Sequence, residues 1–154
     1  MEREYVGELV LEDTVEITDS CYEKGVWCQI ITYCVPGLYK GYADIVDDED
    51  WGIRVARLSI YKDDIQVDLK DMKLLDGEVG VDAGLAGFFR DKPDLDAEWS
   101  EFCDKLFAGG TRKMSWADSL RGDRDALWSE SGCGDGGYSA YANDDHSAFT
   151  IVFM

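Results

Sequence analysis

Apolar side chains in this chain recur mostly at every second position, in short runs that are separated by turn-forming residues. Leu9 and Leu11 alternate with polar neighbours, and Val15 and Ile17 repeat the spacing a few residues later. Successive side chains of a β-strand point to opposite faces, so this period buries one face of a strand and exposes the other. The pattern therefore predicts a β-rich fold of short strands joined by turns.

The longest extended runs lie in the first half of the chain. Residues 26–35 are rich in β-branched and aromatic side chains and end at Pro36-Gly37, a common turn pair. Because residues 38–46 resume the extended pattern, the two runs are predicted to form a hairpin. Residues 53–60 carry apolar side chains on both faces, which indicates a central strand.

More strands are expected further along the chain. Ile65, Val67 and Leu69 alternate with polar residues, and Gly77 and Gly80 frame a short run that ends at the sequence V-D-A-G. Three closing strands are predicted over residues 126–130, 138–142 and 148–153.

One segment has a helical period instead. After Pro93, apolar side chains recur three or four residues apart, as expected for one face of a helix: Leu95, Trp99, Phe102, Cys103, Leu106 and Phe107. Asp94 or Asp96 can cap the start of this helix, and Gly109-Gly110 can end it.

These patterns together predict an α+β fold in a single domain, residues 1–154. The sheet is expected to be a mainly antiparallel meander, either a sandwich or a partial barrel. One amphipathic helix, residues 95–107, is expected to pack on it, because a sheet with one apolar face needs a cover.

The charge is strongly one-sided, with 33 Asp and Glu against 15 Lys and Arg and a formal net charge of -18. Such a surface repels nucleic acid and anionic membranes, and no run approaches the roughly 18 apolar residues of a membrane span. A basic protein surface, such as that of a nucleic-acid-binding protein, would be attracted instead. The competing interpretation is that the acidity only keeps the protein soluble.

The cysteines do not indicate a framework. Their number is odd, their spacing is uneven, and no C-x-x-C motif occurs among Cys21, Cys28, Cys34, Cys103 and Cys133. We therefore predict neither a disulfide scaffold nor a zinc site. The opening Met-Glu-Arg-Glu-Tyr lacks the apolar stretch of a signal peptide, so a cytoplasmic protein with reduced thiols is expected.

No familiar catalytic motif is present. His146 is the only histidine and falls in the last turn, where a solvent-facing residue is a more common outcome than a general base. Residues 132–137 satisfy G-x-G-x-x-G, but that motif binds dinucleotides only where it opens a helix, and residues 138–142 are extended in pattern. We predict no catalytic residue, no metal and no cofactor, and binding is expected in preference to catalysis.

The glycine-rich segment is then predicted to be a tight loop between two strands, with Asp135 near its tip. It either serves the turn alone or touches a ligand. Asp19 and Asp82 also lie at strand ends, and Cys21 follows the first of them. Hard cations take carboxylate oxygens, so one hypothesis is a small-ligand or metal-binding sensor or enzyme that uses Asp19, Cys21, Asp82 and Asp135. The other is that these aspartates cap local backbone N–H groups.

Four consecutive acids interrupt the strands after residue 46. Asp47, Asp48, Glu49 and Asp50 must lie in solvent, and Trp51 follows them directly. Tryptophan is enriched among the residues that dominate interface energies. These five residues are the predicted contacts with a basic partner.

Several motifs occur in a fixed order: I-T-D-S-C-Y at 17–22, V-P-G-L-Y at 35–39, D-W-G at 50–52, V-D-A-G at 81–84 and S-G-C-G-D-G-G-Y at 131–138. This set resembles a family of small uncharacterised bacterial and phage proteins, classed as a domain of unknown function. Ser20 stands where proline is expected in that pattern, and Cys133 where an aromatic residue is expected. The resemblance implies an intracellular prokaryotic or phage protein and no particular reaction.

Charge and resemblance together predict a small acidic binding protein that docks on a basic protein surface. A prophage-encoded, nucleic-acid-mimicking inhibitor of a defence nuclease is one example. The alternative is the ligand or metal site at the aspartate turns.

Overall fold

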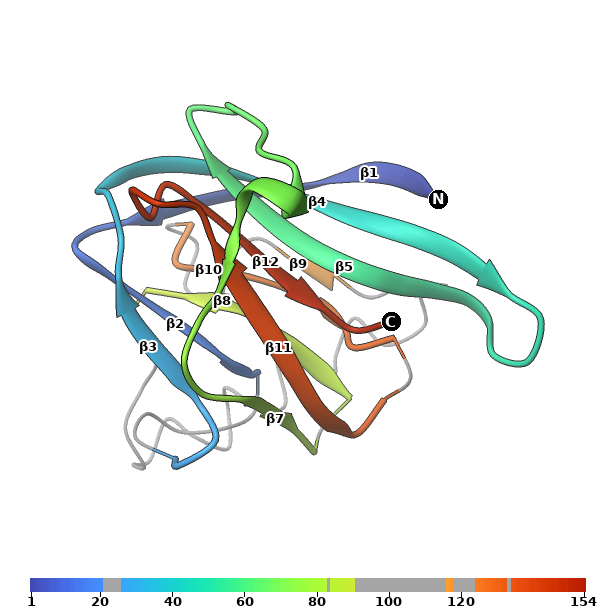
Figure 1. Cartoon of the computed structure of the whole chain (residues 1–154). Coiled ribbons are helices and arrows are strands. Elements are labelled where there is room, and N and C mark those ends of the chain that lie inside the picture. The colour runs from blue at the N-terminus through green and yellow to red at the C-terminus, as the bar shows by residue number, and fades with distance from the viewer. Residues whose placement is uncertain (21–25, 83, 91–115, 118–123, 133) are drawn as a thin grey trace.

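The computed structural model describes residues 1–20, 26–82, 84–90, 116–117, 124–132 and 134–154. These residues form two antiparallel sheets that face each other (Figure 1). The larger sheet contains, in spatial order, β1 (Glu2–Leu11), β4 (Gly37–Asp48), β5 (Gly52–Lys62), β12 (Ala148–Val152), β11 (Gly136–Ala142) and β6 (Lys73–Leu74), with β7 (Val79–Val81) paired to β11. The smaller sheet contains β3 (Ile30–Tyr33), β2 (Thr14–Asp19), β8 (Leu85–Phe89), β10 (Ala126–Glu130) and β9 (Trp116–Ala117).

One hydrophobic core lies between the two sheets, which makes the arrangement a β-sandwich. The larger sheet contributes Leu9, Tyr39, Leu58 and Phe149, among others, and the smaller sheet contributes Val15, Ile17, Phe88 and Leu127. Phe88 and Phe149 meet across the interface with ring centroids 6.5 Å apart. The alternating residues of the sequence therefore bury the inner face of each sheet.

The prediction of a β-rich, mainly antiparallel fold is confirmed. The closing strands are found as β10, β11 and β12, and the short strand near Gly80 is β7. The predicted helix at 95–107 lies outside the described residues. Within the described ranges the only helical element is one 3-10 turn, η1 (Leu69–Asp71), and no helix there is long and apolar enough to cross a membrane.

The predicted hairpin of residues 26–35 with 38–46 is wrong. β3 pairs with β2 in the smaller sheet, whereas β4 pairs with β1 and β5 in the larger one. The chain at Pro36 therefore passes from one sheet to the other. Alternation identifies a strand but carries no information about which strand will be its partner.

The strand predicted from Ile65, Val67 and Leu69 is also absent. Ile65 is exposed, and Leu69 opens the 3-10 turn. The chain turns away at Asp63 and Asp64, which have φ angles of 53° and 59°. Residues 63–72 then cover part of the outer face of the larger sheet, where Val67 and Leu69 pack against the second cluster: Tyr42, Tyr61, Met72, Tyr141 and Ala148.

The prediction that residues 53–60 form a central strand is confirmed, because β5 lies between β4 and β12. Its alternation is broken by one extra residue. Asp44 pairs with Arg57 but Ile45 pairs with Val55, so Ala56 forms a β-bulge. Val55 and Leu58 consequently both face the core, and Arg57 is turned to the outer face.

Candidate functional site

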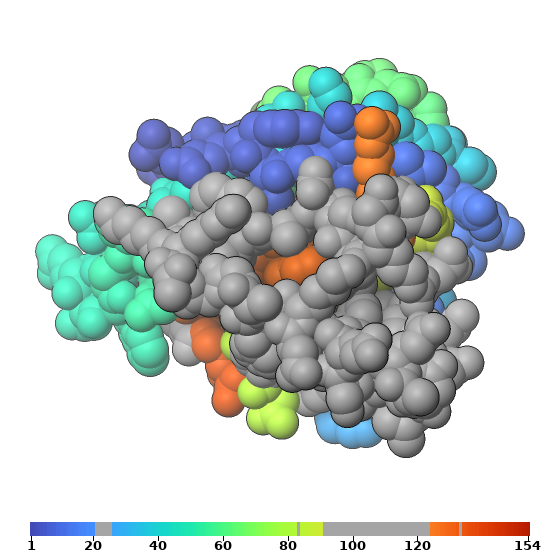
Figure 2. Space-filling model, turned by 180° about the vertical axis from the view of Figure 1, so that it is seen from behind, coloured from blue at the N-terminus to red at the C-terminus, as the bar shows by residue number. Residues whose placement is uncertain are grey.

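β4 and β5 extend beyond their neighbours in the larger sheet. The last pair between β1 and β4 is Glu2 with Ile45, and the last pair between β12 and β5 is Val152 with Arg57. Beyond these points, within the described residues, β4 and β5 form ladder pairs only with each other. The end of this hairpin stands clear of both sheets in Figure 1 and projects beyond the rest of the surface in Figure 2. We call residues 46–55 the acidic hairpin.

A side chain of β4 shapes the tip of the acidic hairpin. Asp48 Oδ1 accepts hydrogen bonds from the backbone N–H of Asp50, at 2.9 Å, and of Trp51, at 3.0 Å. Gly52 follows with a φ of 77°, a left-handed conformation that glycine adopts without steric cost. Arg54 Nε donates to the carbonyl oxygen of Trp51 at 2.8 Å, and its guanidinium lies 6.0 Å from the indole centroid. The tip is therefore ordered by its own polar contacts.

The structure brings all five predicted partner contacts together at this tip. Asp47, Glu49 and Asp50 are exposed, and Trp51 has 51% of its surface accessible. In the described part of the chain, none of the four acids takes part in an ion pair. Their charges consequently add to one negative potential at the end of an arm.

An open groove runs beside the base of the acidic hairpin. Its volume is about 520 Å³, and it is lined by Met1, Glu2, Ile45, Val46, Asp47 and Ile53. Four of these side chains are apolar and two are acidic. The combination of an apolar floor with a charged rim resembles the anatomy of protein interfaces.

The predicted aspartate turns lie at one end of the sandwich. The buried Asp19 accepts a hydrogen bond on Oδ2 from the backbone N–H of Asp82, at 2.6 Å. Gly136 pairs with Val81, which places the exposed Asp135 next to the exposed Asp82 along the β7–β11 ladder. Cys21 lies outside the described residues. Asp19 thus has a capping role, and no group of three His, Cys, Asp or Glu in the described ranges is arranged to hold a metal.

The glycine-rich loop connects two strands, as predicted, and these strands belong to different sheets. It joins β10 of the smaller sheet to β11 of the larger one. Ser131 Oγ and the Tyr138 hydroxyl both donate to the carbonyl oxygen of Gly134, at 2.7 and 2.6 Å. Gly134 itself has a φ of 94°. These two hydrogen bonds hold the loop in place where the chain crosses from the smaller sheet to the larger one.

His146 is less exposed than expected of a turn histidine. Its ring stacks on Tyr33 with centroids 3.8 Å apart, and Nδ1 lies 2.9 Å from the Tyr33 carbonyl oxygen. Phe149 contacts the imidazole ring edge-on, with ring centroids 5.7 Å apart. The side chain therefore links the β11–β12 turn to the edge strand β3.

Cys28 and Cys34 are free and buried. The Cys34 thiol donates to the carbonyl oxygen of Glu12, and burial together with the charge of Asp13 raises its pKa to about 11. This thiol is protonated at neutral pH and is a poor nucleophile.

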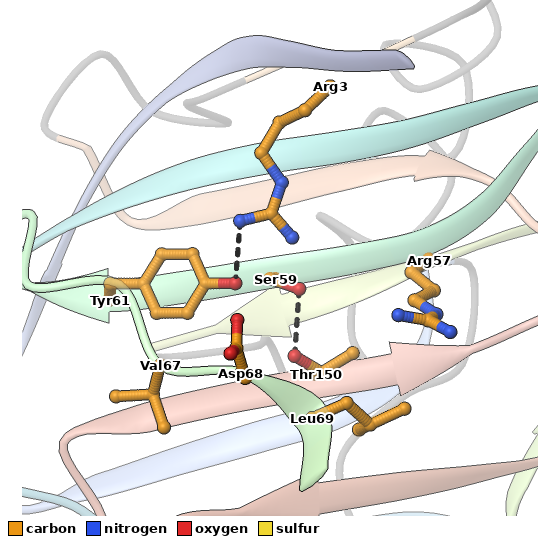
Figure 3. Close-up of a pocket in the computed structure, with 8 residues that line it drawn as sticks. All are labelled: Arg3, Arg57, Ser59, Tyr61, Val67, Asp68, Leu69 and Thr150. Atoms are coloured by element: carbon orange, nitrogen blue, oxygen red, sulfur yellow. Dashed lines mark hydrogen bonds between the residues drawn. The ribbon is translucent and has the colours of Figure 1, made fainter. Parts of the chain in front are cut away.

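Sequence reasoning missed a polar cavity on the outer face of the larger sheet (Figure 3). It has a volume of about 60 Å³. Strands β1, β5 and β12 of the sheet form its floor. The segment that covers the outer face of the sheet, residues 67–69, forms its wall. The lining residues are Arg3, Arg57, Ser59, Tyr61, Val67, Asp68, Leu69 and Thr150. The signal in the sequence was the presence of Arg57 and Ser59 on the same face of the predicted central strand.

Glu130, at the end of β10, provides a test of pH dependence. Its Oε1 is buried without a hydrogen-bond partner, and burial raises its pKa above the ordinary value of 4.5, although Arg54 opposes the shift. Between the ordinary and the raised pKa, Glu130 is therefore protonated in the folded state and ionised in the unfolded state. Stability falls as the pH rises from the ordinary value through the raised one.

We expect Glu130→Gln to raise the melting temperature at neutral pH and to have no such effect below the ordinary glutamate pKa. Solvent screening at this half-buried position limits the gain to about 1 kcal/mol or less. Thermal melts from pH 3 to pH 8 measure the effect, with Glu49→Gln as a control for the loss of one negative charge. A gain that is equal at both ends of the range would contradict the assignment.

Comparison with known proteins gave no match: no family model, no curated protein and no solved structure matches this chain. The resemblance to the bacterial and phage family stays a prediction.

Proposed function

We propose that this protein is a small acidic binding protein that docks on a basic surface of a partner protein through the acidic hairpin. The observation that supports this most is the projection of the hairpin beyond both sheets, with four carboxylates at its end that form no ion pair with the described residues. The end of the hairpin forms ladder pairs only between its own two strands, and a two-stranded ribbon alone is marginally stable in water, so it adds little to the stability of the sheet. The length of this arm is thus explained better by contact with another molecule than by folding.

The charge of the arm and of the whole chain favours one class of partner. A net charge of -18 speeds the encounter with a basic surface and repels polyanions. Proteins that handle nucleic acid carry such basic surfaces, which neutralise phosphates. The four carboxylates would occupy the place of phosphates, as in an inhibitor of a defence nuclease.

Trp51 and the neighbouring groove provide the apolar part of the interface. Trp51 is half-exposed and its carbonyl is held by Arg54, so the indole is presented with little further ordering. The apolar floor at Ile45, Val46 and Ile53 lies at the base of the same hairpin. An aromatic anchor beside an apolar groove, with acids at its rim, is the composition of an interface centre.

The proposal is tested by capturing partners from a bacterial lysate with the tagged full chain, followed by native mass spectrometry at low and high salt. We expect one stoichiometric protein whose affinity falls at least tenfold as salt rises, because exposed charges are screened beyond about 8 Å at 0.15 M. The triple variant Asp47→Asn, Glu49→Gln and Asp50→Asn should lose this partner. It leaves Asp48 in place, since that side chain shapes the turn.

A matched triple variant distinguishes the effect of the acidic hairpin from the effect of net charge alone. Glu12→Gln, Asp71→Asn and Asp76→Asn remove three exposed negative charges elsewhere and should keep the partner. Equal loss in both triple variants, or an affinity independent of salt, would reject the acidic hairpin as the docking site. A co-purified small molecule or metal without any protein would instead favour the alternative, a ligand or metal sensor at the Asp19, Asp82 and Asp135 turns.

A further inference from the structure

The cavity of Figure 3 contains an arginine that pairs with none of the described residues. Arg57 Nε is buried and makes no hydrogen bond, and the guanidinium takes part in no ion pair of the described residues. Arginine stays charged at any physiological pH, and a desolvated charged donor without an acceptor costs free energy. Arg3 in the same cavity differs, because it donates to Asp44, Tyr61 and Gln66. Arg57 therefore provides, on the floor of the cavity, a buried donor that no described residue uses.

A second unused donor lies beside it. The hydroxyls of Ser59 and Thr150 are 2.7 Å apart, and the two residues are 1% and 2% exposed. Each hydroxyl has one proton, and their mutual hydrogen bond uses only one of them. The other buried O–H has no acceptor in the described part of the chain. Figure 3 shows this pair between Arg57 and Tyr61 on the sheet floor.

We propose that this cavity binds a single small oxyanion, a phosphate or carboxylate group, held by Arg57 and the Ser59–Thr150 pair. The planar guanidinium matches the geometry of both groups. A volume of about 60 Å³ suits one such group and is far below the several hundred Å³ of a nucleotide or drug-sized pocket. The site lies on the outer sheet face and does not depend on the function proposed for the acidic hairpin.

Asp68 allows a second test, because its charge is opposite to that of Arg57. Its carboxylate lines the cavity at the rim, with 78% of the side chain exposed, and forms only a loose pair with Lys70 at 3.9 Å. A negative charge there repels an anion, although water screens it. Loss of the Arg57 charge and loss of the Asp68 charge must consequently change anion affinity in opposite directions.

The experiment is calorimetric titration of the full chain with inorganic phosphate and, separately, with acetate at constant ionic strength. We expect saturable binding with one site for at least one probe. Arg57→Gln should weaken it at least tenfold and Thr150→Val several-fold, while Asp68→Asn should tighten it. Lys73→Gln, which removes an exposed positive charge outside the cavity, should leave it within twofold.

The unfolding of the same variants without ligand excludes a merely structural role for Arg57. A site kept for a ligand stores strain when empty, so Arg57→Gln should melt at or above the wild-type temperature. If the protein binds phosphate but not acetate, the natural ligand carries a tetrahedral anion. If it binds acetate, the ligand carries a carboxylate. The proposal is overturned by no saturable binding of either probe up to about 10 mM, by affinity unchanged in Arg57→Gln, or by weaker binding in Asp68→Asn.

Discussion

We expect Gly87→Ala to destabilise the protein by at least about 3 kcal/mol, a large part of the 5–15 kcal/mol that holds a typical domain together. Gly87 lies in the middle of β8, paired with Thr18 of β2 on one side and Trp128 of β10 on the other. An added Cβ would fall on the backbone, against the carbonyl oxygen of Leu127 and 2.6 Å from the Cα of Trp128. The backbone of a central ladder cannot move aside without breaking its hydrogen bonds.

Urea unfolding followed by fluorescence measures this effect, with Gly137→Ala as the matched control. Gly137 is also a strand glycine, but there the new carbon meets only the exposed side chain of Glu78, which can rotate away. The control should change stability by no more than about 1 kcal/mol. Equal midpoints for the two variants would mean that β8 and β10 adjust to a side chain at this position.

The second large effect is expected at Arg3. Its Nε and one terminal nitrogen donate to the two carboxylate oxygens of Asp44, at 2.7 and 2.9 Å, and the other terminal nitrogen donates to the Tyr61 hydroxyl. The Asp44 side chain is only 8% exposed. The hydrogen bond to Asp44 also raises the arginine pKa, so the guanidinium stays ionised. One side chain near the start of β1 thereby ties three strands of the larger sheet together.

Arg3→Met is expected to cost about 2–3 kcal/mol, because it leaves a nearly buried carboxylate without its counter-charge. The double variant Arg3→Met and Asp44→Leu should recover most of the loss, since it removes the stranded charge as well. Lys73→Met breaks a fully solvated ion pair with Asp144 and should not shift the midpoint measurably. If the double variant is no more stable than Arg3→Met, the cost arises from lost packing and not from the buried charge.

The two candidate sites differ in how far the sequence could reveal them. The acidic hairpin is contiguous, so its acids and Trp51 could be found by reading the chain in order, although its projection depends on where β1 and β12 stop. The oxyanion cavity joins Arg3, Arg57 and Thr150, which are far apart in the sequence. Nothing local to any of them shows that the others are near.

The sequence by itself determined several of the strands. A two-residue period follows from the backbone geometry of one strand, which explains why β2, β7 and the three closing strands were predictable. Only the tertiary structure decided which strands pair, that Pro36 lies between sheets, and that residues 63–72 cover the outer face. It also decided the bulge at Ala56, which turns Arg57 away from the core. Pairing and register depend on contacts between distant segments, and the alternation within one strand is compatible with many partners.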